Sequence, residues 1–175
     1  MINLIKILKK EIFPAIGLVI FLALFRVIPH PWNFTPILAV GVFSGFYFRN
    51  FFLGSFIVIL AMFIGDLYLG FHNTMLFTYV SIIVAVGIGM LIRNFKFKEI
   101  FLTGFASSVS FFIITNFGAW LTLEMYEKSF GGLVQSYILA IPFFHNTLIS
   151  TFLYLIILKL LFNLSLKKKI IKFSF

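Results

Sequence analysis

A small set of polar side chains in an otherwise apolar sequence could bind or transform a ligand. The set comprises Arg26, His30, Trp32, Asn33, Asp66, His72, Asn116, Trp120, His145 and Asn146. Imidazoles and a carboxylate can ligate nickel, cobalt or zinc, whereas amides, imidazoles and indole rings together suit a flat organic ligand. No two of the histidines have the spacing that places two imidazoles on one helix face, so no metal site is predicted. The set therefore favours binding of a small organic molecule.

Asp66 is the most unusual member of this set, because it follows an uncharged apolar run over residues 51–64. A carboxylate inside a membrane costs several kcal/mol unless it is paired, hydrated or protonated. Arg26 is the nearest cation in expected depth, so one interpretation is an ion pair between the two. The other is that Asp66 reaches headgroup water near the turn at residues 70–73, while Arg26 extends its own charge to the interface. The sequence leaves both interpretations open.

The residues that common enzyme mechanisms need are missing. The chain has no cysteine, and no glycine-rich loop ending in Lys-Ser or Lys-Thr that would hold the phosphates of ATP. Ser107, Ser108 and Ser110 have no histidine at their depth that could act as a general base. We therefore predict no enzymatic activity and no cofactor.

Composition places the chain in a membrane. Hydrophobic residues make up 62% and charged residues 11% of it, whereas about a quarter of the residues in soluble domains are charged. The apolar runs are long enough for helical spans and lack the alternation of outer-membrane barrels. The predicted fold class is thus an all-α integral membrane protein, with a single domain over residues 1–175. The net charge of +9 suits anionic lipid headgroups and requires no nucleic acid.

Six transmembrane helices are predicted from the apolar runs and the breaks between them. They cover residues 12–28, 36–48, 51–69, 73–92, 99–121 and 145–162. Thr35 and Asn73 are the expected N-caps of the second and fourth helices. The apolar stretch before the sixth helix is too long for one span, and Pro142 divides it. A short interfacial or re-entrant helix is therefore expected over residues 133–141.

The distribution of positive charge predicts the orientation. With six spans and cytoplasmic N and C termini, twelve of the fourteen Lys and Arg residues lie on the cytoplasmic side, and only Arg26 and Lys128 lie outside. This asymmetry follows the positive-inside rule. The candidate ligand-binding residues then gather at the outer ends of the helices, although membrane interfaces also collect Trp and capping residues without any ligand. The expected location is the bacterial cytoplasmic (inner) membrane, with several passes through it.

Small residues recur at a spacing that favours close packing of helices. Gly41 and Gly45, Ala61 and Gly65, and Ala85 and Gly89 are pairs of this kind. The fifth predicted helix carries a stripe of small and polar residues on one face, comprising Gly104, Ser107, Ser108, Phe111, Thr115, Gly118, Ala119 and Thr122. We expect that face to meet protein or a cavity and not lipid.

Four segments carry a resemblance to a known family. They are Phe25-Arg26 with Pro29-His30-Pro31-Trp32-Asn33-Phe34-Thr35-Pro36, then Gly65-Asp66-Leu67-Tyr68-Leu69-Gly70, then Asn116-Phe117-Gly118-Ala119-Trp120, and Ile141-Pro142-Phe143-Phe144-His145-Asn146. The chain resembles a family of small bacterial membrane proteins of unknown function, labelled as candidate transport proteins. Its size, helix count and outward polar ends are also similar to the S-components of energy-coupling factor transporters. Those proteins bind a vitamin or a metal ion outside and deliver it through a separate ATPase module.

These observations predict a substrate-binding membrane subunit for uptake of a vitamin-like organic micronutrient. The resemblance implies a transmembrane coupling subunit and ATPase subunits as partners, although the first helix lacks the alanine-x-x-x-alanine pattern by which many S-components dock. Two alternatives stay open. One is a non-transporting scaffold similar to membrane subunits of cell-wall synthesis, and the other is an uptake component for nickel or cobalt. A rise in melting temperature with ligand would separate a binding protein from a scaffold.

Overall fold

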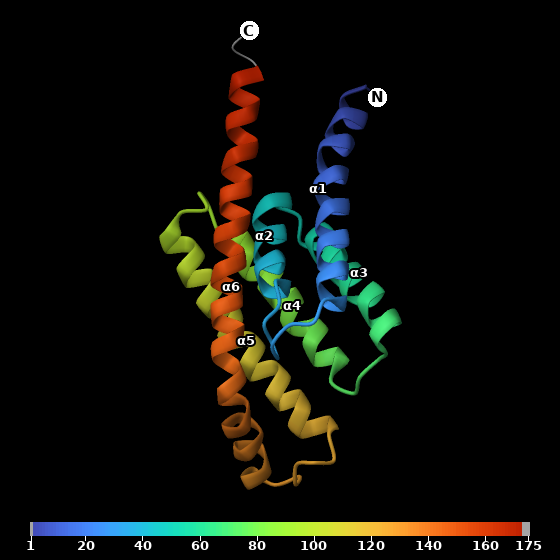
Figure 1. Ribbon diagram of the computed structural model, residues 1–175, viewed down its shortest axis with the longest axis vertical. Helices are drawn as coiled ribbons and strands as arrows, with labels where there is room; N and C mark the ends of the chain where they lie inside the picture. Colours follow the sequence, from blue (N-terminus) through green and yellow to red (C-terminus); the bar gives the residue numbers. More distant parts are fainter. Residues whose placement is uncertain (1, 173–175) are drawn as a thin grey trace.

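The computed structural model describes the backbone of residues 2–172 and the side chains of residues 12–164. The described chain is all helical, as predicted, and contains α1 (Ile2–Val27), α2 (Ile37–Phe48), α3 (Phe51–Leu69), α4 (Met75–Met90), α5 (Phe97–Thr122) and α6 (Phe130–Lys172). Figure 1 shows that both chain termini lie at one end of the molecule. The connections α1–α2, α3–α4 and α5–α6 lie at the helix ends that point away from the termini (Figure 1).

Among residues 12–164, three helical segments are long and apolar enough to cross a membrane, namely Phe51–Leu69, Phe97–Thr122 and the part of α6 over Phe130–Leu164. The helices α2 and α4 are shorter, with 12 and 16 residues, so they extend only about 18 and 24 Å at 1.5 Å per residue. Many large apolar side chains are exposed, including Phe52 and Phe130, as contact with lipid tails requires. These features indicate a membrane protein, while the number of crossings stays a prediction.

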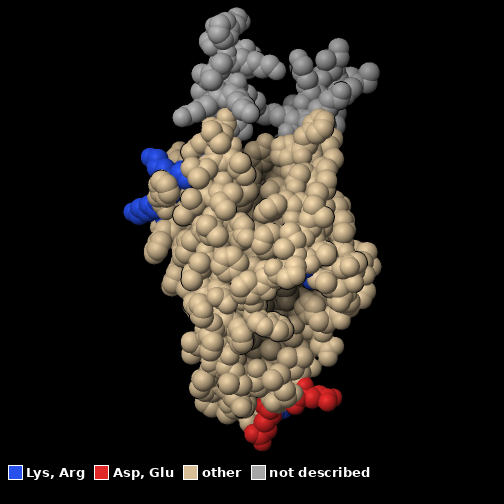
Figure 2. All heavy atoms as spheres, viewed as in Figure 1, with Lys and Arg blue, Asp and Glu red and all other residues tan. Residues whose placement is uncertain are grey.

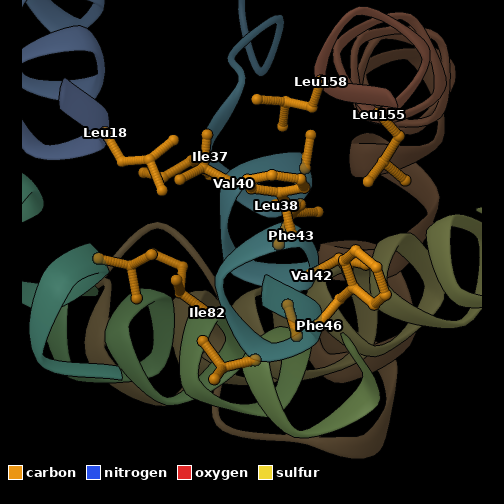
Figure 3. Packing of buried hydrophobic residues seen from close by; sticks show 14 of the residues in the cluster. Leu18, Ile37, Leu38, Val40, Val42, Phe43, Phe46, Ile82, Leu155 and Leu158 are labelled. Carbon is orange, nitrogen blue, oxygen red and sulfur yellow. The ribbon is translucent and has the colours of Figure 1, made fainter. Parts of the chain in front are cut away.

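The centre of the fold is α2. Every residue of this helix except Tyr47 is buried, because a helix that is apolar on all sides is stable only when neighbours cover each face. It packs against all five other helices. Figure 3 shows the α2 side chains between Ile82 of α4 on one side and Leu155 and Leu158 of α6 on the other.

Small residues allow α2 and α4 to approach closely, as their spacing predicts. A Cβ atom added at Gly89 would lie 2.8 Å from the Cα atom of Val42, and one added at Gly45 would overlap the α4 backbone. Across the same interface, a Cβ atom at Gly41 would lie 3.3 Å from the Cβ atom of Ala85. The two backbones are therefore in direct contact, which is the packing mode that small residues provide inside membranes.

The bounds of α3 agree with the prediction and have local causes. The side chain of Asn50 caps the N-terminus by accepting a hydrogen bond of 3.0 Å from the amide of Leu53. At the other end, Gly70 has a φ angle of 96°, a conformation that glycine adopts without steric cost. The helix therefore ends where a glycine permits the turn.

The two N-caps predicted for α2 and α4 are wrong. The N-cap position of α2 is occupied by Pro36, not Thr35, and that of α4 by Thr74, not Asn73. Neither residue makes a side-chain capping bond. The hydroxyl of Thr74 lies 3.0 Å from Nδ1 of His72 instead, so this side chain orders the α3–α4 connection.

The helix α6 runs without interruption from Phe130 to Lys172 and contains Pro142. The expected division into a short interfacial or re-entrant helix over residues 133–141 and a separate sixth helix is therefore wrong. Pro142 has no amide hydrogen to donate to the carbonyl of Ile138, so the helix loses one hydrogen bond at this turn. A full break would leave several more backbone groups without partners in an apolar medium, which costs more than the single lost bond.

Pro142→Ala is expected to leave the fold unchanged and to raise the melting temperature of the protein in detergent. Alanine restores the missing amide hydrogen and removes the ring, so the free energy of unfolding should rise by up to about 3 kcal/mol. Thermal unfolding followed by circular dichroism measures the change. A lower melting temperature for the variant would show that the proline ring itself stabilises the fold at this position.

Candidate functional site

A cavity of about 650 Å³ lies among the helix ends that face away from the termini. Its walls come from the end of α1, from the α1–α2 and α3–α4 connections, and from parts of the helices α2 to α6. Phe111, Met62 and Leu38 supply apolar surface. Small-molecule sites typically enclose roughly 300–1,000 Å³ and combine apolar walls with a few polar groups, so this cavity has the size and character of such a site.

Six of the ten residues singled out from the sequence line this cavity. They are Arg26, His30, Trp32, Asn33, His72 and Asn116. Trp32 is 79% exposed, which places its ring at the rim of the cavity. The fold thus brings together polar residues from three segments that are far apart in the sequence.

The other four candidates, Asp66, Trp120, His145 and Asn146, are not among the lining residues. Asn146 donates a hydrogen bond of 3.0 Å from Nδ2 to the carbonyl oxygen of Trp32, which ties α6 to the α1–α2 connection. Trp120 donates one of 3.0 Å from Nε1 to the carbonyl oxygen of Glu127 in the α5–α6 connection. His145 is exposed. Asn146 and Trp120 therefore hold the connections around the cavity in place.

Asp66 is fully buried and forms an ion pair with Arg26, whose side chain is 19% exposed. The second carboxylate oxygen accepts a hydrogen bond of 2.6 Å from the hydroxyl of Tyr79. Nη1 of Arg26 lies 3.3 Å from the sulfur of Met62. This arrangement confirms the ion pair and contradicts the alternative in which Asp66 reaches headgroup water. Buried charges require such pairing and hydrogen bonding.

Gly65 makes room for the ion pair. A Cβ atom at this position would overlap the side chain of Arg26 beyond its Cγ atom and lie 3.3 Å from its Cβ atom. The arginine therefore crosses α3 at the glycine on its way to Asp66. The spacing of Ala61 and Gly65 predicted close packing of helices. In the structure, Gly65 also makes room for the side chain of Arg26.

Hydroxyl groups make up most of the polar lining, and reasoning from the sequence did not single them out as ligand contacts; only Thr115 was placed on a helix face expected to meet protein or a cavity. They belong to Thr35, Thr74, Thr78, Thr115, Thr147, Ser150 and Thr151. The spacing of the three on α6 places them on one face of that helix, a signal that the sequence contains. The small and polar face predicted for α5 also reaches the cavity, through Thr115 and Ala119.

Thr151 is fully buried, and its hydroxyl has no hydrogen-bond partner within the described part of the chain. Leaving a buried hydroxyl unpaired costs about 1–3 kcal/mol. Because Thr151 lines the cavity, a water molecule or a ligand in the cavity would recover this cost. The residue is therefore a polar contact point that the fold itself does not use.

The histidines and acids do not assemble into a metal centre. Among the residues that the structure describes, no three His, Asp or Glu side chains come together in a way that could hold a metal ion. His30 and His72 line the cavity, but His145 does not. Both carboxylate oxygens of Asp66 are engaged by Arg26 and Tyr79. The three histidines and Asp66, which were considered as ligands for nickel, cobalt or zinc, therefore do not lie together at one site.

Charged side chains are separated along the length of the molecule. In the face that Figure 2 shows, most of the Lys and Arg surface lies toward the end that carries the termini, with one small patch midway and one beside the Asp and Glu surface at the opposite end. Apolar surface covers the region between them (Figure 2). Positive charge marks the cytoplasmic side of membrane proteins, so the cavity lies nearer the end that lacks this marker.

The chain belongs to a family of unknown function (DUF6580), which it matches over residues 6–173. No curated protein and no solved structure matches it. Family membership therefore identifies what the chain is related to and leaves its activity to be inferred from the cavity.

Proposed function

We propose that this DUF6580 protein is a substrate-binding membrane subunit for uptake of a small, vitamin-like organic molecule. The observation that carries the proposal is the cavity of about 650 Å³, whose hydroxyl, amide and imidazole groups stand beside the aromatic walls of Phe111 and Trp32. Binding sites for organic molecules have this mixture of apolar surface and few polar groups. The buried, unpaired hydroxyl of Thr151 gives a ligand a further contact.

The proposal includes an orientation in the membrane. Six passes through the bacterial cytoplasmic membrane, with both termini inside, would open the cavity to the outside. Support comes from the location of both termini at one end (Figure 1) and from the Lys and Arg side chains toward that end (Figure 2). An outward cavity is the arrangement that uptake requires.

Energy for uptake would come from separate subunits, since the sequence has no phosphate-binding loop for ATP. A transmembrane coupling subunit with ATPase subunits, as in energy-coupling factor transporters, is the partner set that we propose. Metal uptake is not part of the proposal, because the described His, Asp and Glu side chains form no cluster that could hold an ion.

A screen of vitamins and nucleosides against the purified protein is expected to contain compounds that raise its melting temperature. A ligand at 100 times its dissociation constant stabilises the protein by about 2.7 kcal/mol. Differential scanning fluorimetry in detergent measures the shift. If no compound changes the melting temperature, the binding function is wrong and a scaffold is the better description.

Two matched variants test whether the binding site is this cavity. Thr151→Val keeps the shape of the side chain and removes the hydroxyl, so the affinity for a stabilising compound should fall about fivefold or more. Ser108→Ala also removes a buried, unpaired hydroxyl, but Ser108 is not among the residues that line the cavity. This control should bind like the parent protein. Equal affinities for all three proteins would place the binding site elsewhere.

A further inference from the structure

The helical wall of the cavity carries hydroxyl groups whose hydrogen atoms are already committed. Thr115 donates to the carbonyl oxygen of Phe111 over 2.7 Å, and Thr78 donates to that of Thr74 over 3.3 Å. A hydroxyl has one hydrogen to donate and two lone pairs with which to accept. Once the hydrogen is bound to a carbonyl of the same helix, the oxygen can only accept a bond from a ligand.

The two hydrogen-bonded hydroxyls of α6 are committed in the same way. Thr147 donates to the carbonyl oxygen of Phe143 over 3.3 Å, and Ser150 shares its hydrogen between the carbonyl oxygens of Thr147 at 3.1 Å and Asn33 at 3.5 Å. Thr151, one residue further, keeps its hydrogen free. The polar surface that α6 offers to the cavity is therefore mainly accepting.

An amide and an imidazole extend this accepting surface. Asn116 donates one of its two Nδ2 hydrogens to the carbonyl oxygen of Phe112 over 2.7 Å, so one N–H group remains while its Oδ1 atom keeps its full accepting capacity. His30 has Nδ1 at 2.9 Å from the carbonyl oxygen of Pro31. Since a carbonyl oxygen only accepts, Nδ1 carries the hydrogen, and Nε2 of the neutral ring is an acceptor.

Arg26 is the only charged residue among the described residues that line the cavity. It adds one unpaired donor, because its Nε atom is buried and has no hydrogen-bond partner within the described part of the chain, but its charge does not reverse the balance. Its charge is compensated by Asp66, which is fully buried and is also held by Tyr79. An anionic ligand that bound to Arg26 would have to share the guanidinium with this fixed carboxylate. Two negative charges beside one positive charge disfavour that arrangement in a partly desolvated site.

We infer that the ligand of this cavity is a flat, uncharged or cationic molecule that presents N–H donors to the wall formed by α4, α5 and α6, and that carboxylates and phosphates are excluded. This inference rests on the proposed function and specifies the substrate class of the same site. Phe111 and Trp32 provide the flat apolar surfaces, while the accepting oxygens of Thr115, Thr147 and Asn116 receive the donors.

Benzamidine, benzamide and benzoate test the inference, because they share one ring and differ in the charge and donors of a single planar group. Isothermal titration of the purified full chain at millimolar concentrations gives the three affinities. We expect benzamidine and benzamide to bind at least about tenfold more tightly than benzoate, because a carboxylate leaves the accepting groups unpaired and brings no hydrogen of its own. Benzoate binding as tightly as benzamide would overturn the inference while leaving the proposed function intact.

Two matched variants on α5 test whether benzamidine binds to the accepting groups of the cavity wall. Thr115→Val removes an accepting oxygen from the cavity and should weaken benzamidine binding about fivefold. Thr103→Val removes a hydroxyl with an equivalent bond, donated to the carbonyl oxygen of Glu99 over 2.6 Å, from a position outside the cavity lining. The control should bind like the parent protein. If Thr115→Val does not fold, Ser150→Ala replaces it in the same comparison.

The remaining outcomes are also decisive. If none of the three compounds binds, the inference is wrong, while the proposed function is decided separately by the screen of vitamins and nucleosides. If benzamidine binds but neither Thr115→Val nor Ser150→Ala weakens it, the accepting wall is not the recognition surface and the inference fails. Weakening by the cavity variants together with rejection of benzoate is the one combination that supports it.

Discussion

Arg26→Ala is expected to destabilise the protein by roughly 3–5 kcal/mol, the usual cost of removing one partner from a buried ion pair. The variant leaves the carboxylate of Asp66 fully buried, with the hydroxyl of Tyr79 as its remaining partner. Chemical unfolding in detergent measures the loss. Arg93→Ala is the control, because Arg93 is exposed and its removal should change stability by less than about 0.5 kcal/mol.

A double-mutant cycle separates the ion pair from general damage. Asp66→Asn keeps the shape of the side chain and leaves the charge of Arg26 without its partner. This variant should cost less stability than Arg26→Ala, because Arg26 is 19% exposed whereas the carboxylate that Arg26→Ala leaves unpaired is fully buried. Adding Asp66→Asn to Arg26→Ala removes the unpaired charge, so the double variant should regain part of the lost stability. Losses that simply add would show that the pair contributes no interaction energy. If Arg26→Lys is as stable as the parent protein, a simple positive charge is sufficient at this position and the fixed geometry of the guanidinium group contributes no stability.

Gly89→Val is the second substitution for which we expect a large effect, with a loss of about 3 kcal/mol or more in the free energy of unfolding. The added side chain would begin at a Cβ atom 2.8 Å from the Cα atom of Val42, so α2 and α4 would have to separate. Since α2 is buried against all five other helices, the separation would disturb packing throughout the core. Thermal unfolding and size-exclusion chromatography of the variant measure the outcome.

Gly87→Ala is the matched control on the same helix. A Cβ atom at Gly87 would meet only the ring of Phe51, at 3.8 Å, which is an ordinary contact distance. Alanine also favours helix over glycine by up to about 1 kcal/mol, so this variant should be as stable as the parent protein or slightly more stable. A loss comparable to that of Gly89→Val would mean that α4 tolerates no change at any glycine.

The fold could be predicted well where the sequence itself ends a helix. The bounds of α3 follow from Asn50 and Gly70, and the contact between α2 and α4 follows from the spacing of their glycines. The division predicted at Pro142 was wrong, because a proline that breaks a helix in water is tolerated within α6. Breaking the helix there would cost more hydrogen bonds than the proline removes, and that comparison depends on the surroundings, which the sequence does not state.

The site could be predicted only in part, for a related reason. Arg26, His30 and Asn33 stood out because polar residues are rare in so apolar a chain, and the cavity contains them. Threonine and serine on apolar helices are usually bonded to their own backbone, so Thr151 attracted no attention and Thr115 was predicted only as part of a helix face and not as a ligand contact. Which of them faces a cavity depends on how the helices are rotated, and that follows from tertiary packing.

Two hydrogen bonds join α6 to the α1–α2 connection across most of the chain. Asn146 donates to the carbonyl oxygen of Trp32 and Ser150 to that of Asn33, over sequence separations of 114 and 117 residues. Ribosomes add roughly 5–20 residues per second, so on the order of 6–20 seconds pass between synthesis of the connection and synthesis of its partners on α6. During that interval the rim of the cavity has neither of these anchors. A nascent chain therefore completes the cavity only with the last helix, and a chain that stops before residue 146 would lack both hydrogen bonds that tie this rim to α6.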